Sequence, residues 1–191
     1  MKPHFTIVTP TIMRDSLLDC CKSVEMQTCK EWTHWIIVDL PRHEIDFAKL
    51  QLTMHQQRHY RYCNTRHNDF GHTCTRDIYP YLNGEYIYRL DDDNILSSPN
   101  VLEQMKAVTA DWALFPIIRE GGIFYSDPPS YGHVDTGSVL VKREFAQWPA
   151  STRYEADWDF VDGLMKNHPN YQAFPDVDPI MVMSRISRGA K

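Results

Sequence analysis

Short apolar runs alternate with segments of helical periodicity through the first half of this chain. The runs are rich in β-branched and aromatic residues, which is typical of buried strands; they are Phe5–Thr9, Trp35–Asp39, His59–Asn64 and Glu85–Leu90. The segments between them, 17–27, 44–57 and 77–82, are predicted helices. This alternation predicts an α/β fold whose mostly parallel sheet carries helices on both faces.

The second half is less regular. Helices are predicted over 101–108 and 157–166, and strands over 112–118 and 137–142, with a Gly/Pro-rich loop between the two strands. A polar loop is expected over 66–75, around Gly71. No internal repeat or linker divides the chain, so we expect one domain over residues 1–191.

Composition narrows the possible functions. A length of 191 residues suits a single core, and 42% apolar with 24% charged residues is typical of a folded domain. The net charge is −5 and no long basic run occurs, so a nucleic-acid partner is not expected.

The cysteines and the hydropathy of the chain indicate the compartment in which the protein is expected. The five cysteines include no C-x-x-C pair and no array with zinc-motif spacing, which favours reduced thiols. No apolar run approaches the roughly 20 residues needed to span a bilayer, and the N-terminus is unlike a secretory signal. We therefore expect a soluble cytoplasmic protein without a transmembrane segment.

Three consecutive acids, Asp91, Asp92 and Asp93, follow the last of the four runs. Adjacent carboxylates repel each other and strands disfavour Asp, so some compensating interaction is expected. Carboxylates at a strand end suit Mn²⁺ or Mg²⁺. In an extended chain the first and third acids point the same way and the second is opposed, so Asp91 and Asp93 can share one ion. A solvated acidic turn or a helix N-cap is the alternative.

Several motifs occur together in the order of a known family. The chain opens with a strand followed by Thr-Pro-Thr, continues to an apolar run ending in Asp39, and places Arg76 before a helix that leads to Asn-Gly-Glu-Tyr-Ile. The D-x-D motif follows as Asp91-Asp92-Asp93. Over residues 5–100, and more loosely over 130–165, this pattern resembles the family 2 glycosyltransferases of the GT-A fold.

The resemblance implies a Rossmann-like nucleotide-diphospho-sugar transferase domain, with its nucleotide-binding half in 1–100 and its acceptor-binding half and tail in 101–191. It implies that Asp39 hydrogen-bonds the base, that Arg76 contacts the nucleotide or diphosphate, and that Asp91 meets the ribose or metal. It also implies a loop that lines the base and ribose, formed by Thr9, Pro10 and Thr11, and places Asp92 with the donor-binding residues and Asp93 as a metal ligand. A departure is that Asp39 is followed by Leu40-Pro41-Arg42, which leaves the base less defined.

The resemblance extends to a catalytic base. The segment from Tyr154 to Phe160 is similar to the family's E-D-x-D/E-L/F motif and aligns Asp157 with the base, although Ala156 replaces the usual Glu. Glu155 and Asp159 are alternatives for this role. The acids also have an ordinary interpretation, because carboxylates favour a helix N-terminus through the helix dipole.

Other residues are weaker candidates. Asp135 could bind the acceptor or the donor sugar, and His133 could be a metal ligand or contact the acceptor. Arg185 and Arg188 could reach a phosphate. Each has a simpler interpretation as a locally satisfied loop residue or a solvated charge. An aromatic group could form a sugar platform or belong to the core; it comprises Phe124, Tyr125, Tyr131, Trp148 and Trp158.

Taken together, these features predict a metal-dependent glycosyltransferase that uses Mn²⁺ or Mg²⁺ and a nucleoside-diphosphate sugar, with a UDP-sugar as the expected donor. It would move a hexosyl or deoxyhexosyl group to a glycan, a lipid-linked saccharide or another hydroxyl acceptor, with inversion by single displacement. A nucleotidyltransferase is the first alternative, although no G-x-x-x-x-G-K phosphate loop occurs. A cation- or carbohydrate-binding module without catalysis is the second.

Overall fold

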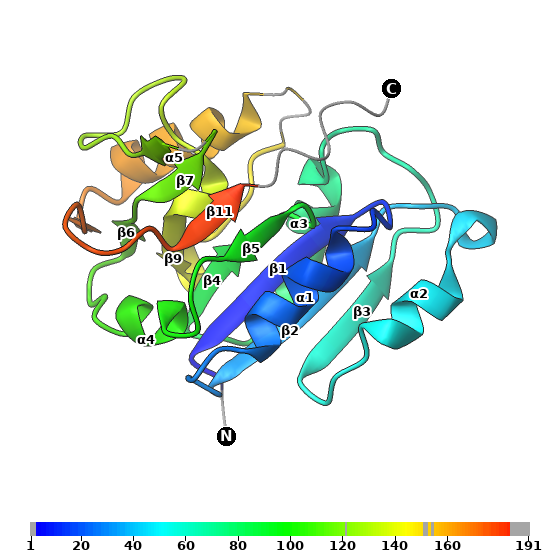
Figure 1. Ribbon diagram of the computed structural model, residues 1–191. Helices are drawn as coiled ribbons and strands as arrows, with labels where there is room; N and C mark the ends of the chain where they lie inside the picture. The colour runs from blue at the N-terminus through cyan, green and yellow to red at the C-terminus, as the bar shows by residue number, and fades with distance from the viewer. Residues whose placement is uncertain (1–2, 121, 151–152, 154, 184–191) are drawn as a thin grey trace.

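A computed structural model describes residues 3–120, 122–150, 153 and 155–183 (Figure 1). A seven-stranded sheet with the order β10-β6-β9-β4-β1-β2-β3 forms its centre. The strands are β1 (Phe5–Thr11), β2 (Trp32–Val38), β3 (Arg58–Tyr62), β4 (Tyr86–Arg89), β6 (Trp112–Leu114), β9 (Val139–Lys142) and β10 (Tyr171–Ala173). Only β9 runs antiparallel to its neighbours, β4 and β6, in this sheet. The mixed, mostly parallel sheet confirms the predicted fold class.

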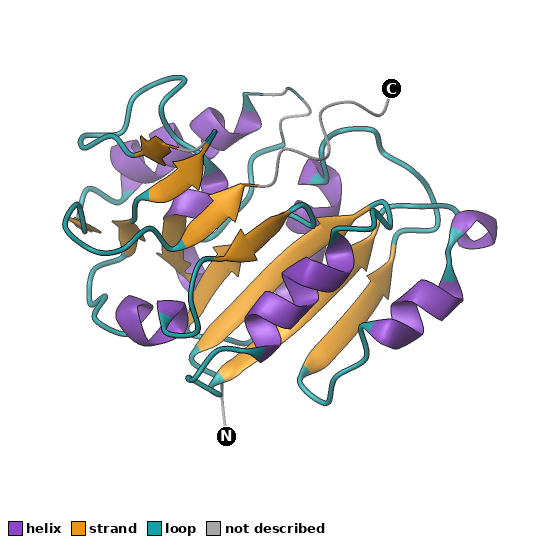
Figure 2. Ribbon diagram, in the orientation of Figure 1, coloured by secondary structure: helices purple, strands orange, loops and turns teal. Residues whose placement is uncertain are grey.

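Helices cover both faces of this sheet, as expected (Figure 2). They are α1 (Leu17–Glu25), α2 (Phe47–Leu52), α3 (His72–Ile78), α4 (Val101–Met105) and α5 (Ala156–Asn167), with 3-10 turns at Arg42–Glu44, Tyr79–Tyr81, Thr136–Ser138 and Arg143–Phe145. Phe5 and Ile7 of β1 pack with α1 and α4, whereas Val8 packs with α3 and α5. Alternation of side chains along one central strand therefore supplies a core on each side of the sheet. No helix in the described part of the chain is long and apolar enough to cross a membrane.

A second, smaller sheet has the order β5-β11-β7-β8. Its strands are β5 (Asn94–Leu96), β7 (Ile117–Arg119), β8 (Gly122–Phe124) and β11 (Met181–Met183). Because β4 belongs to the large sheet and β5 to the small one, Asp91–Asp93 lie where the chain passes from one to the other.

Pro10 lies inside β1, although the sequence predicts that this strand ends at Thr9. The reason is the direction of the backbone groups. The carbonyls of His4 and Val8 accept hydrogen bonds from the N–H groups of Tyr86 and Leu90 on the β4 side. The backbone N–H and C=O groups of the even-numbered residues of β1 therefore face β4. The β1–β4 register ends at Val8; the missing N–H of Pro10 therefore falls where no ladder continues.

Other boundaries also differ from prediction: the helix expected over 77–82 is α3, which begins earlier at His72, and the helix expected over 101–108 ends at Met105. The expected loop over 66–75 gives way to α3 at His72, and the expected helix over 44–57 is α2 with a short 3-10 turn before it. The expected strand over 112–118 is divided at Pro116 between β6 and β7 in different sheets, because proline has no N–H to continue the β9 ladder. Strands β5, β8, β10 and β11 have three residues each, too few to show a periodicity.

Candidate active site

A cleft of about 930 Å³ opens beyond the carboxyl ends of β1, β2 and β4. This is the edge where ligands bind in open α/β sheets. The first half of the chain contributes Pro10, Thr11, Asp39, Asp91, Asp92 and Asp93 to its lining, and the second half contributes Asp135, Glu155, Asp157 and Trp158. The structure thus brings together most of the residues predicted from the two halves.

The acidic triplet begins a turn, closed by a 3.0 Å hydrogen bond from the Asn94 N–H to the Asp91 carbonyl. Asp92 points inward and is 1% exposed. Its carboxylate accepts from Thr11 Oγ1 at 2.5 Å and from Arg14 Nη1 at 2.6 Å. Burial raises the pKa of Asp92 to about 6, against the lowering effect of Arg14 and Thr11. Asp92 therefore ties the end of β4 to the end of β1.

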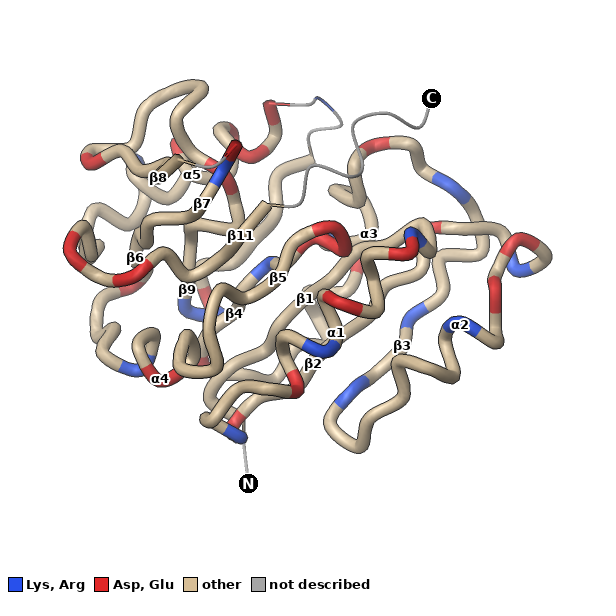
Figure 3. Tube along the Cα trace, viewed as in Figure 1, with Lys and Arg blue, Asp and Glu red and all other residues tan. Residues whose placement is uncertain are grey.

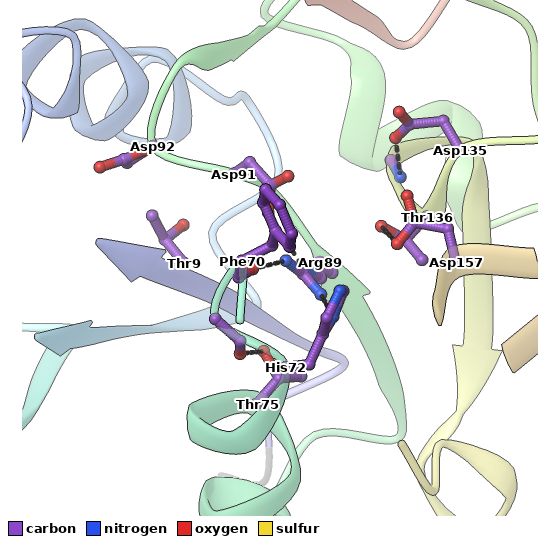
Figure 4. A network of polar contacts seen from close by, with 12 residues as sticks. Thr9, Phe70, His72, Thr75, Arg89, Asp91, Asp92, Asp135, Thr136 and Asp157 are labelled. Carbon is purple, nitrogen blue, oxygen red and sulfur yellow. Dashed lines mark hydrogen bonds and ion pairs between the residues drawn. The ribbon is translucent and has the colours of Figure 1, made fainter. Parts of the chain in front are cut away.

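Asp91 and Asp93 lie in the cleft, with side chains 37% and 18% exposed. Oδ1 of Asp91 accepts from Arg89 Nε at 2.9 Å, and Oδ2 of Asp93 lies 3.5 Å from Arg14 Nη1. Figure 4 shows Asp91 and Asp92 pointing apart. The inward middle acid and the two outer acids at the cleft agree with the arrangement expected from the sequence, although the acids form a turn.

These two carboxylates fit a hard divalent cation that shares its ligands with a substrate. Mg²⁺ in nucleotide sites is commonly held by one or two carboxylates, with phosphate oxygens and water completing the shell. Among the described residues, the acidic triplet does not bring three ligand atoms within 4.8 Å of one another. Asp91 and Asp93 would therefore hold Mn²⁺ or Mg²⁺ together with the donor rather than alone.

Arg89, the last residue of β4, is a buried cation at the centre of the site. Its guanidinium donates to Asp91, to the Phe70 carbonyl at 2.7 Å and to His72 Nδ1 at 3.2 Å, as Figure 4 shows. It also lies 4.7 Å from the centre of the Trp148 ring. Arg89 is not among the site residues predicted from the sequence, although a charged residue inside the run YIYRL is a signal in its own right.

Asp157 lies in the first turn of α5, across the cleft from Asp91 (Figure 4). Thr136 Oγ1 approaches its Oδ1 at 3.4 Å. Neighbouring Asp135 accepts from the Gly137 N–H at 2.8 Å. Burial, and then the charge of Asp135, raise the pKa of Asp157 to about 7, while Arg89 lowers it. A carboxyl with this pKa can accept a proton near neutral pH.

Thr9 and Arg76 are placed outside the described lining of the cleft. Thr9 is buried in the sheet, where its Oγ1 lies 2.9 Å from His34 Nε2. Arg76 projects from α3 and pairs with Asp77 at 3.2 Å. Their roles in donor binding remain predictions.

The weaker candidates divide between the cleft and the rest of the surface. Glu155 lines the cleft, whereas Asp159 pairs with Arg153 at 2.7 Å. His133 Nδ1 lies 3.2 Å from the Tyr131 carbonyl. Of the predicted aromatic platform, Tyr131 and Trp158 line the cleft, whereas Trp148 is in the core and Phe124 and Tyr125 pack against it. Arg185 and Arg188 lie outside the described residues.

The charges of the cleft are dominated by acids. The described lining has seven carboxylates and four guanidinium groups, the latter from Arg14, Arg66, Arg89 and Arg119. Figure 3 shows the acidic segment between β4 and β5 at this edge. The sequence does not predict this group of four arginines, because they are scattered along the chain and only the fold brings them to one cleft.

Solved structures of other proteins share this fold, although no family model and no curated protein matches the chain. TarS 1-349 from S. aureus superposes with a TM-score of 0.76 at 12% identity, covering 96% of this chain and 60% of that chain; its complexes with UDP and UDP-GlcNAc are also similar.

Two further structures are similar. A mannosyltransferase from Pyrobaculum calidifontis, in complex with GDP-Man and Mn²⁺, superposes with a TM-score of 0.71 at 15% identity, covering 99% of this chain and 59% of that chain. A 4-diphosphocytidyl-2C-methyl-D-erythritol synthase from Anaerococcus prevotii superposes with a TM-score of 0.59 at 11% identity, covering 91% of this chain and 87% of that chain. The chain spans about 60% of the length of the first two proteins. It has the GT-A fold of these glycosyltransferases.

Proposed function

We propose that this protein transfers a hexosyl or deoxyhexosyl group from a nucleoside-diphosphate sugar to a hydroxyl acceptor, with Mn²⁺ or Mg²⁺ bound by Asp91 and Asp93. A UDP-sugar is the expected donor, and a glycan or lipid-linked saccharide the expected acceptor. One observation carries the proposal: a single cleft holds the two partly exposed carboxylates of the β4–β5 turn and, across from them, a carboxyl whose pKa is about 7.

The nucleotide would lie along the edge formed by β1 and β2. Pro10, Thr11 and Asp39 line this end of the cleft, and the carboxylate of Asp39 is an acceptor for an N–H group of a base. The diphosphate would extend toward Asp91 and Asp93. The lining has seven carboxylates and four guanidinium groups, so without a bound cation its negative charge would repel a diphosphate. Binding of the diphosphate would therefore require a cation.

Transfer would proceed as a single displacement. The acceptor hydroxyl gives its proton to the Asp157 carboxylate while its oxygen attacks the anomeric carbon of the sugar. The bond from that carbon to the phosphate oxygen breaks, and the electron pair leaves with the nucleoside diphosphate. A divalent cation supplies Lewis-acid stabilisation of the departing diphosphate. Attack opposite the leaving group inverts the anomeric centre. Arg89 holds Asp91 in place throughout.

The likeness to the diphosphocytidyl synthase, which extends over 87% of that chain, favours nucleotidyl transfer as a second candidate. The leaving group distinguishes the two reactions. With Mn²⁺ and a panel of UDP- and GDP-sugars, glycosyl transfer or slow donor hydrolysis releases nucleoside diphosphate. Nucleotidyl transfer instead releases pyrophosphate from a nucleoside triphosphate. Donor binding without either release would identify a binding module.

A further inference from the structure

A second group of ligand-type side chains lies beside the β2 end of the cleft. It consists of Asp39, Cys63, His67 and Cys74, whose ligand atoms all lie within 4.8 Å of one another. Asp39 follows β2, Cys63 follows β3, His67 lies in the next loop and Cys74 is on α3. The parallel strands β2 and β3 thus deliver two of the four residues to one edge of the sheet.

The spacing of these atoms is close to that of a tetrahedral metal site. His67 Nδ1 lies 2.6 Å from Asp39 Oδ1 and 3.5 Å from Cys74 Sγ, and the two Sγ atoms of Cys63 and Cys74 are 2.7 Å apart. Zinc bonds to sulfur, nitrogen and oxygen place such ligand atoms about 3.3–3.8 Å from each other. Shifts of about 1 Å therefore suffice to reach that geometry.

We propose that Asp39, Cys63, His67 and Cys74 bind one Zn²⁺ ion in a closed, structural site. Two thiolates and an imidazole select zinc over the hard cations that suit Asp91 and Asp93. Four protein ligands leave no open position, which is typical of structural rather than catalytic zinc. The sequence conceals this site because its ligands come from four segments and match no zinc-motif spacing.

The proposed ion would fix the loop that forms one wall of the cleft. Residues 63–71 connect β3 to α3, and Arg66, Asn68 and Phe70 of this loop line the cleft. Asn64, Asn68 and Phe70 have φ values of 59°, 56° and 58°. Such left-handed residues are strained and persist only where the surrounding structure holds them. Zinc bound at both ends of the loop would supply that restraint.

Zinc at this group would be independent of glycosyl transfer. Asp39 would use Oδ1 for the metal, the atom that now lies nearest His67 Nδ1, and keep Oδ2 for a base. The zinc would be retained on dialysis, whereas the cation at Asp91 and Asp93 would exchange freely without donor.

The test is the metal content of the full chain, purified under reducing conditions without a metal-chelating tag and dialysed against a mild chelator. Inductively coupled plasma mass spectrometry should find roughly one zinc ion per chain. Replacement by Co²⁺ should give a thiolate-to-cobalt charge-transfer band and the visible bands of tetrahedral cobalt. Cys63→Ser and Cys74→Ser should each weaken these bands and lose most of the zinc.

Two controls separate the possible outcomes. Cys29→Ser changes a buried cysteine outside the group and should retain the zinc. The double variant Asp91→Asn, Asp93→Asn should lose donor turnover but retain the zinc. Failure of the proposed function is therefore distinguishable from failure of this zinc site. The proposal is overturned if the unaltered protein holds no zinc, if Co²⁺ shows no thiolate band, or if thiol counting finds a Cys63–Cys74 disulfide.

Discussion

Asp92 and Asp157 line the same cleft, yet their surroundings suit them to different tasks. Asp92 is enclosed and receives hydrogen bonds from Thr11 and Arg14, so its carboxylate is a structural anchor. Asp157 receives a longer, 3.4 Å contact from Thr136, and burial beside Asp135 raises its pKa to about 7. Both carboxyls have a raised pKa, but two short hydrogen bonds occupy the oxygens of Asp92. The more weakly bonded Asp157 is therefore the better placed to take a proton from a substrate.

Asp157→Asn should abolish transfer and at the same time stabilise the fold at neutral pH. Loss of a general base lowers the rate by about 10²–10⁴. Because the folded pKa of about 7 lies above the ordinary 3.8, the folded state binds this proton more tightly, and wild-type stability falls as pH rises between these values. Asn removes that loss, so the free energy of unfolding should increase by roughly 1–2 kcal/mol at pH 8 and little at pH 4.

Denaturant unfolding at the two pH values and donor turnover at pH 8 measure both effects. Asp159→Asn, two residues along the same helix and outside the cleft lining, is the matched control and should keep turnover. For the wild type, kcat/KM should rise with pH through about 7 as Asp157 loses its proton. Retained turnover in Asp157→Asn would exclude this residue as the base.

Arg14→Ala should destabilise the protein in a pH-dependent way. Asp92 is 1% exposed, and Arg14 is its only cationic hydrogen-bond partner in the described chain. Removal of a partner from a buried pair costs about 3–5 kcal/mol; the side chain of Arg14 is 40% exposed, so we expect about 2 kcal/mol at pH 8. Without Arg14 the pKa of Asp92 rises further, so Asp92 continues to reduce the stability of the variant above pH 6, where its contribution in the wild type has levelled.

Thermal unfolding at pH 5 and pH 8 checks this. Arg14→Lys, which keeps the cation, should lose less stability than Arg14→Ala. An equal loss at both pH values would mean that packing of the arginine stem, rather than its charge, stabilises the turn.

At the scale of elements, the sequence predicts those with a long or strongly alternating apolar pattern and misses those that depend on the rest of the fold. The strands β1, β2 and β4 carry Thr11, Asp39 and Asp91 to one edge, as expected from the parallel alternation. The small sheet is invisible in the sequence because three-residue strands such as β5 show no period. For the same reason the position of Arg119, which lies on β7 and lines the cleft, could not be predicted.

Gly71 is the point where the loop between β3 and α3 meets β1. It has a φ of +77°, and a Cβ there would lie 2.4 Å from the Cβ of Pro10. Gly71→Ala should therefore incur both left-handed strain of about 1 kcal/mol and a backbone shift that moves the loop away from the cleft. We expect a loss of about 2–3 kcal/mol in stability together with weaker donor binding.

Gly132→Ala is the matched control, because Gly132 also has a φ of +77° but nothing lies within 4 Å of its added Cβ. It should lose only the strain, about 1 kcal/mol. The difference between the two variants in denaturant unfolding isolates the contact with Pro10. If both variants lose the same stability, the loop does not need its close approach to β1.

At the scale of the whole molecule, the cleft joins two halves of the chain that differ in regularity. The parallel half supplies the acids of the β4–β5 turn, and the second half supplies Asp135 and Asp157 across the opening. The two halves share the large sheet, because β9 pairs with β4, and they also share the small one, because β11 pairs with β5. Carboxylates from both halves therefore line one cleft.

This charge balance predicts how metal removal acts on the folded protein as a whole. After dialysis against EDTA, UDP alone should raise the melting temperature little, because the seven carboxylates of the cleft oppose its diphosphate. With Mn²⁺ added, saturating UDP at about 100 times its Kd should stabilise the fold by roughly 2.7 kcal/mol. The double variant Asp91→Asn, Asp93→Asn should lose this metal-dependent gain and, having fewer negative charges, respond somewhat better to UDP alone. A thermal-shift titration of UDP with and without Mn²⁺ measures all four combinations. Equal stabilisation of the wild type in both conditions would show that the four guanidinium groups suffice to bind the diphosphate, and the cation would then have no part in donor binding.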